Sequence, residues 1–120
     1  MFARNSILIV EDEPLVAMCL AADVEALDGR VVGPLPTVAE ALAVLEQEEV
    51  AGAILDVNLA DRDVTPVARL LASRGVPFVL HSSFGLPARL ARELPGVRLV
   101  PKPAPSYTVI AHLLATMAGD

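Results

Sequence analysis

The sequence has few of the residues that mark secreted or membrane-spanning proteins. Its 120 residues include one cysteine, no tryptophan and only 3% aromatic residues. Cys19 alone cannot form an internal disulfide, which favours a reducing compartment. No apolar run approaches the ~20 residues that cross a bilayer, and the first residues lead into a strand-like run rather than a signal peptide. We therefore expect a cytoplasmic protein without a membrane partner.

The chain also has no basic run. It carries 15 acidic residues against 9 lysines and arginines, with a formal net charge of −6. A surface of this sign repels the phosphate backbone unless a local basic patch compensates, and the sequence shows no such patch. We expect no nucleic-acid partner.

What the chain does have is apolar residues, 54% of the total, in short runs separated by turn signals. Five runs have strand length, and a helical pattern follows each one. The predicted strands are residues 6–10, 30–33, 51–56, 76–81 and 97–100, with Pro34 and Pro36 ending the second. The predicted helices are 14–27, a segment from a capping box at Thr37 toward Glu49, a segment from a cap at Asp63 or Thr65 to Gly75, then 87–94 and 106–117.

Alternating strands and helices joined by short loops predict parallel strand pairing with right-handed crossovers. The expected fold is a doubly wound α/β sheet in one domain, residues 1–120, with no output domain. The first helix has a wide apolar surface, most of which we expect to be covered, and Cys19 within it is expected to fill core. That surface also suggests a weak dimer as the alternative to a monomer.

Polar side chains follow the strands at the edge where their carboxyl ends meet. Glu11 and Asp12 follow the first strand, Asp56 closes the third, and Ser82 and Lys102 follow the fourth and fifth. Ligands bind at this edge in open α/β sheets. Carboxylates ~4 Å apart repel by about 4 kcal/mol at an effective dielectric near 20, and a divalent cation relieves that repulsion. All-oxygen ligands and an incomplete cage favour Mg²⁺.

With Mg²⁺ and Lys102 beside it, Asp56 could attack phosphorus and hold a phosphoryl group as an acyl phosphate. The metal and the ammonium group would neutralise the charge that builds on the phosphoryl oxygens. The hydroxyl of Ser82 could donate a hydrogen bond to one of these oxygens.

The same residues carry a resemblance to a known family. The blocks ILIVEDEP, ILDVNL, PFVLHSS and VPKP are similar, in order and spacing, to the four signature blocks of the response-regulator receiver domain. The run DVNLADRDVTPVARLLASRGVPFV resembles most closely the often stand-alone receivers of alphaproteobacteria. The resemblance covers essentially the whole chain and implies a flavodoxin-like, five-stranded parallel sheet in the order 2-1-3-4-5 with five flanking helices.

The resemblance also implies a role for each matching residue. Asp56 would be the phosphoacceptor, and Mg²⁺ would be held by Glu11, Asp12, Asp56 and the backbone carbonyl of Asn58. Ser82 would be the switch hydroxyl, with Ser83 as the alternative. Lys102 would bridge to the phosphoryl group, and the bond from Lys102 to Pro103 would be cis.

Three positions depart from the family pattern. Leu99 stands where the family often has an inward-turning Phe or Tyr, Ala104 replaces the usual aromatic after Lys-Pro, and His81 precedes the switch hydroxyl in place of a small or aliphatic residue. An aromatic switch is therefore not implied. His81 has two interpretations, a phosphohistidine relay or a packed and hydrogen-bonded side chain, and the second is favoured.

The leading hypothesis is a single-domain response regulator that receives a phosphoryl group from a histidine kinase or a histidine phosphotransfer protein. It would be no enzyme beyond its own Mg²⁺-dependent phosphorylation and dephosphorylation. It would act through phosphorylation-controlled contact with a protein partner, or as a phosphate shuttle or sink. The face of the fourth helix, fifth strand and fifth helix is the expected output surface.

Three other hypotheses compete with this one. A phosphorylation-independent adaptor with the same fold is favoured slightly by Leu99 and Ala104. An aspartyl-nucleophile phosphatase generally needs a second acid two residues after the nucleophile, where this chain has Asn58. A flavin carrier would need stacking aromatic and phosphate-cradling groups that the sequence lacks.

Overall fold

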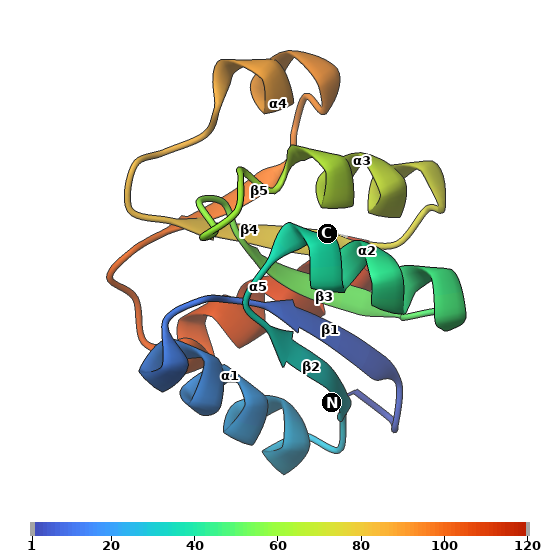
Figure 1. The fold of residues 1–120 in the computed structure, drawn as a ribbon. Helices are drawn as coiled ribbons and strands as arrows, with labels where there is room; N and C mark the ends of the chain where they lie inside the picture. Colours follow the sequence, from blue (N-terminus) through green and yellow to red (C-terminus); the bar gives the residue numbers. More distant parts are fainter. Residues whose placement is uncertain (1, 120) are drawn as a thin grey trace.

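The computed structural model describes residues 2–119, and it contains a five-stranded parallel sheet with helices on both faces (Figure 1). The strand order is β2-β1-β3-β4-β5, which confirms the predicted doubly wound fold. The elements are β1 (Ser6–Val10), α1 (Pro14–Ala26), β2 (Arg30–Leu35), α2 (Val38–Gln47), β3 (Gly52–Asp56), α3 (Thr65–Ser73), β4 (Phe78–Ser82), α4 (Ala88–Glu93), β5 (Arg98–Pro101) and α5 (Ser106–Met117).

The helices form two layers with a separate core on each face of the sheet. Helices α2, α3 and α4 cover one face, and α1 and α5 cover the other (Figure 1). The strand residues alternate between the two cores, so that Leu55 packs in the first and Ile54 in the second. The central strands β3 and β4 are buried along their whole length, which explains their continuous apolar runs.

The predicted cap of α2 by Thr37 is confirmed, whereas the N-cap residue of α3 is Val64, which lies between the predicted candidates Asp63 and Thr65. The hydroxyl oxygen of Thr37 accepts from the backbone N–H of Glu40 at 3.1 Å, where α2 begins. The carboxylate of Asp63 accepts from the backbone N–H of Thr65 at 2.8 Å, where α3 begins. Both bonds satisfy N–H groups that have no partner inside their helix.

Strand β2 is longer than the sequence predicts. It continues through Gly33 and Pro34 to Leu35, with a shift in its register against β1 between Leu8 and Val10. An edge strand pairs on one side only, so a proline without an N–H is tolerated there, especially at an irregularity. Gly33 has φ +103°, a conformation open to glycine, and a Cβ there would lie 2.8 Å from the carbonyl oxygen of Ile9.

The expectation that the apolar surface of α1 is mostly covered is wrong. Its buried residues, Ala17, Leu20 and Val24, form one narrow stripe at helical spacing. Leu15 is 74% exposed and Met18 67%, and Cys19 is exposed rather than in the core. Val16 and Ala21 beside this stripe are partly buried against the second core, and the apolar residues on the outer side of α1 remain in solvent. Within residues 2–119, no helix is long and apolar enough to cross a membrane.

Candidate functional site

Three carboxylates meet at the carboxyl edge of the sheet. Strands β1 and β3 are neighbours, with Val10 opposite Leu55, so Glu11 and Asp12 follow β1 beside Asp56 at the end of β3. One carboxylate oxygen from each of the three acids lies within 4.8 Å of the others. Asp56 is only 5% exposed and Glu11 only 3%. The structure thus brings together the acids that the sequence singled out.

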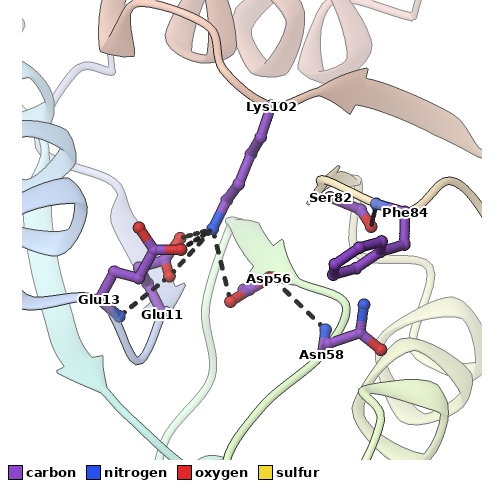
Figure 2. A network of polar contacts seen from close by, with 7 residues as sticks. All are labelled: Glu11, Glu13, Asp56, Asn58, Ser82, Phe84 and Lys102. Atoms are coloured by element: carbon purple, nitrogen blue, oxygen red, sulfur yellow. Dashed lines mark hydrogen bonds and ion pairs between the residues drawn. The ribbon is translucent and has the colours of Figure 1, made fainter.

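Lys102 reaches into this group from the end of β5 (Figure 2). Its Nζ lies 3.1 Å from Oε1 of Glu11, 3.2 Å from Oε1 of Glu13 and 3.6 Å from Oδ2 of Asp56. The side chain of Lys102 is 9% exposed, so most of its ammonium charge is balanced by these acids rather than by water. Glu13 had no role in the sequence prediction, although its position directly after Glu11 and Asp12 was a signal.

Burial and charge act strongly on Asp56. Removal from water, followed by the charge of Glu11 and a hydrogen bond with it, raises the pKa of Asp56 to about 7, and the ammonium group of Lys102 opposes this rise only in part. For Lys102, burial alone would lower the pKa, but the hydrogen bond and charge of Glu11 outweigh it and the pKa is raised. The site therefore holds more negative charge than its lysine neutralises.

The donor set fits a hard divalent cation. Glu11 Oε1 is buried and accepts no hydrogen bond, although Lys102 is close enough for an ion pair. The acids supply only oxygen atoms, which suits Mg²⁺. Asp12 and Asp56 border an open hollow of about 400 Å³, which leaves room for water and for a phosphoryl group. Its lining residues are Asp12, Glu13, Pro14, Leu15, Asp56, Asn58, Ser83, Phe84 and Lys102.

Asn58 and the two serines flank the acids. The backbone N–H of Asn58 donates a long hydrogen bond of 3.4 Å to Oδ1 of Asp56 (Figure 2). Ser82 ends β4 and is 2% exposed, and its hydroxyl oxygen accepts from the backbone N–H of Phe84 at 3.1 Å. Ser83, in contrast, is exposed and lines the hollow itself. In this state Ser82 holds the loop after β4.

The three positions that depart from the family pattern lie outside the acid group. His81 pairs with Asp56 in the register of β3 and β4 and is 3% exposed. Neither of its ring nitrogens has a hydrogen-bond partner, so the expectation of a hydrogen-bonded histidine is wrong. Burial, and then the charge of Lys102, lower the pKa of His81 to about 4, which keeps the ring neutral at neutral pH. Leu99 packs half-buried against the first core and Ala104 against the second.

The backbone around Lys102 fixes the lysine above the acids. The N–H of Lys102 donates to the carbonyl oxygen of Ser82 at 2.8 Å, which ties the ends of β4 and β5 together. The peptide bond between Lys102 and Pro103 is cis.

Comparison with known proteins places this geometry in a family. No protein-family model matches the chain. The solution structure of SdrG from Sphingomonas melonis Fr1 is 40% identical over 98% of this chain and 99% of that one, with a TM-score of 0.80. The chain belongs to the response-regulator receiver family. A second solution structure, of SdrG in a BeF3-activated conformation, is 42% identical with a TM-score of 0.72 and covers 98% of each chain.

This receiver is also similar to larger regulators. The crystal structure of the response regulator PhyR from Brucella abortus is 34% identical over 95% of the receiver and 47% of that chain, with a TM-score of 0.74. The phyllosphere-induced regulator PhyR of Methylorubrum extorquens is 40% identical over 83 residues, 67% of the receiver and 31% of that protein. The receiver thus spans about a third of this curated relative and is close to SdrG- and PhyR-type alphaproteobacterial receivers. It is a two-component signalling protein rather than a conventional enzyme.

Proposed function

We propose that this receiver acts as a single-domain response regulator, residues 1–120, and that Asp56 accepts a phosphoryl group from a histidine kinase or a histidine phosphotransfer protein. The receiver then acts through phosphorylation-controlled contact with a protein partner, or as a phosphate shuttle or sink. The observation that carries the proposal is the position of Asp56, a buried carboxylate between Glu11, Asp12 and Lys102 at the mouth of a hollow.

Asp56 is the nucleophile in this proposal. A carboxylate oxygen of Asp56 forms a bond to the phosphorus of the donor phosphohistidine while the bond from phosphorus to the imidazole nitrogen breaks. The donor imidazole leaves with the electron pair of that bond and takes up a proton from solvent. Lys102 Nζ, 3.6 Å from Asp56 Oδ2, lies where it can offset the negative charge of the transferring phosphoryl oxygens.

Glu11, Asp12, Asp56 and the backbone carbonyl of Asn58 would hold the Mg²⁺ ion. When bound, Mg²⁺ supplies positive charge that offsets the carboxylates and the phosphoryl oxygens. Because the pKa of Asp56 is raised to about 7, much of this carboxyl group is protonated at neutral pH in the absence of metal. The receiver is therefore expected to accept phosphoryl groups only with a divalent cation present.

The rim of the hollow favours a protein as the phosphodonor. Leu15 at the start of α1 and Phe84 after β4 both line the hollow, and they are 74% and 87% exposed. Large exposed apolar side chains around a charged centre are typical of a protein docking surface. A phosphohistidine on a helical donor could enter between them.

Ser82 offers a route from the acceptor to an output surface. Its hydroxyl oxygen now accepts from the backbone N–H of Phe84 (Figure 2). If the Ser82 side chain rotates to donate its hydroxyl to a phosphoryl oxygen on Asp56, its oxygen leaves the Phe84 N–H, so the loop after β4 loses that support and α4 can move. The face of α4, β5 and α5 remains the proposed contact surface.

The test is phosphorylation by a small-molecule phosphodonor in the presence of Mg²⁺, followed by intact mass measurement. We expect one added phosphoryl group in the wild type, none in Asp56→Ala, and none when EDTA replaces Mg²⁺. Rapid quenching guards against a short-lived adduct. If the wild type shows no adduct while a control receiver is phosphorylated, the phosphorylation-independent adaptor is favoured. Leu99 and Ala104 slightly favour that hypothesis.

A further inference from the structure

We propose that Asp61 is a positioning residue of the receiver site, because it holds the loop after Asp56 against the first turn of α2. The inference rests on the function proposed above and adds a residue to that site. Asp61 follows Asp56 by five positions and is exposed. Its Oδ1 accepts from the backbone N–H of Val38 at 3.0 Å, and its Oδ2 accepts from the backbone N–H of Ala39 at 3.1 Å.

This contact completes the start of α2 from another part of the chain. The first N–H groups of a helix have no partner inside it. The side chain of Thr37 accepts from the N–H of Glu40. The carboxylate of Asp61 accepts from the N–H groups of Val38 and Ala39, which precede Glu40 in the helix. The hydrogen bond from Val38, and then the other backbone donors, lower the pKa of Asp61, so the carboxylate is ionised at neutral pH. A negative charge at this end of a helix is favoured by the helix dipole.

The loop that carries Asp61 is closed by its own hydrogen bonds. The N–H of Val64 donates to the carbonyl of Val57 at 2.9 Å, and the N–H of Leu59 donates to the carbonyl of Arg62 at 3.2 Å. Asn58 and Asp63 form an antiparallel bridge across the loop. A loop braced in this way moves as a unit, so a contact at Asp61 restrains the whole segment.

The same loop meets the acceptor at its other end. Asn58 donates to Asp56 Oδ1 at 3.4 Å, and its carbonyl is the proposed backbone ligand of Mg²⁺. Asp61 therefore links the amides of α2 to the acceptor through the backbone of a loop that its own hydrogen bonds brace. Coupling between two sites is reciprocal: if the contact to α2 favours metal binding, metal binding must also strengthen the contact to α2.

The experiment compares Asp61→Asn with Thr37→Ala as a matched control. Thr37→Ala removes one cap of α2, and Asp61→Asn removes one of two acceptor oxygens and the charge of another, but only Asp61 belongs to the acceptor loop. In Asp61→Asn we expect the Mg²⁺ dissociation constant, from NMR titration of backbone amides, to rise about fivefold, the lower end of ordinary coupling between sites. In Thr37→Ala we expect it unchanged, while the melting temperature falls by about 3 to 5 °C.

Hydrogen exchange gives a second readout, which needs no phosphate and is measured first without metal and then with Mg²⁺. In the metal-free protein, Asp61→Asn should speed exchange at the amides of Leu59 and Val64, and Thr37→Ala should not. In the wild type, Mg²⁺ should slow exchange at the amides of Val38 and Ala39, and Asp61→Asn should abolish this effect. Asp61→Glu, which keeps the charge, should restore Mg²⁺ affinity to within about twofold of the wild type.

Equal loop exchange in the two variants, or an unchanged Mg²⁺ affinity in Asp61→Asn, would reduce Asp61 to a helix cap and overturn the inference. The outcome is separable from that of the proposed function. A wild type that takes up no phosphoryl group refutes phosphoacceptance, whereas the exchange rates of Leu59 and Val64 still decide the role of Asp61.

Discussion

Replacement of Asp56 by asparagine should stabilise the metal-free protein, although Asp56 is the proposed functional centre. The carboxyl group is buried beside Glu11, and its pKa is raised from 3.8 to about 7. Asparagine keeps the shape and the carbonyl oxygen but never carries the charge. Lys102 retains its ion pairs with Glu11 and Glu13 in the variant, so no lone charge is left behind.

The size of the effect follows from the pKa of Asp56. The folded state keeps this proton up to about pH 7, whereas the unfolded state releases it near 3.8, so wild-type stability falls as the pH rises through that window. A difference of about three pH units corresponds to about 4 kcal/mol. Screening by solvent at the mouth of the hollow reduces the expected gain to about 2 kcal/mol at pH 8.

Urea denaturation followed by circular dichroism in EDTA measures the gain, since the chain has no tryptophan for fluorescence. The linkage relation predicts that the difference in free energy of unfolding between Asp56→Asn and the wild type grows roughly two- to threefold from pH 5 to pH 8. Mg²⁺ at about ten times its dissociation constant should stabilise the wild type by about 1.4 kcal/mol and the variant by less.

Asp63→Asn is the matched control with the opposite sign. A hydrogen bond with Thr65 lowers the pKa of Asp63, so its contribution to stability is present at neutral pH and is lost as the pH falls through its folded pKa. The control variant should therefore be less stable than the wild type at pH 8. If Asp56→Asn brings no gain at pH 8, or a gain that does not vary with pH, the reasoning about the buried acids is refuted.

Two further substitutions test the switch and the edge of the sheet. Ser82→Ala removes the acceptor of the Phe84 N–H and should lower the free energy of unfolding by about 1 kcal/mol. Phosphoryl uptake should persist, while the phosphorylation-dependent NMR shift of the Phe84 amide should be lost. An unchanged shift would exclude Ser82 as the switch. Gly33→Ala places a Cβ 2.8 Å from the carbonyl oxygen of Ile9 at φ +103°, and it should lower the free energy of unfolding in urea by about 2 kcal/mol or more. Gly75→Ala is the control: a Cβ there meets no atom within 4 Å, so this variant should lose less stability.

The fold could be predicted because local signals and burial agree along most of the chain. Strand β1 and helix α5 have the predicted bounds, α1 and β3 differ from theirs by one residue at one end, and α4 and β5 differ by one residue at each end. Strand β2 could not be predicted from its prolines alone, because whether a missing N–H matters depends on which side of the strand has a neighbour. That is a property of the sheet, not of the segment.

The candidate site shows the same division between local and long-range information. The order of strand ends predicts that Glu11, Asp56 and Lys102 converge, because parallel strands share one carboxyl edge. The position of Glu13 after Glu11 and Asp12 indicates that it lies near this edge, but its contact with Lys102 could not be predicted, because the rotamer of a long exposed side chain depends on the loop around it. Asp61 contacts Val38 and Ala39 of α2, which precede it by 23 and 22 positions in the sequence. No local sequence pattern indicates a contact over this separation.

The prolines of the outer strands have a consequence for association between copies of the protein. Strands β2 and β5 are the two edges of the sheet; β2 carries Pro34 and an irregular register, and β5 has only four residues and ends in Pro101. A free edge is a template for pairing with another chain, and proline removes the donor that such pairing needs. Both edges therefore offer few backbone hydrogen-bonding groups to another strand, which disfavours extension of the sheet into aggregates. Contacts with other molecules are expected to use side chains instead.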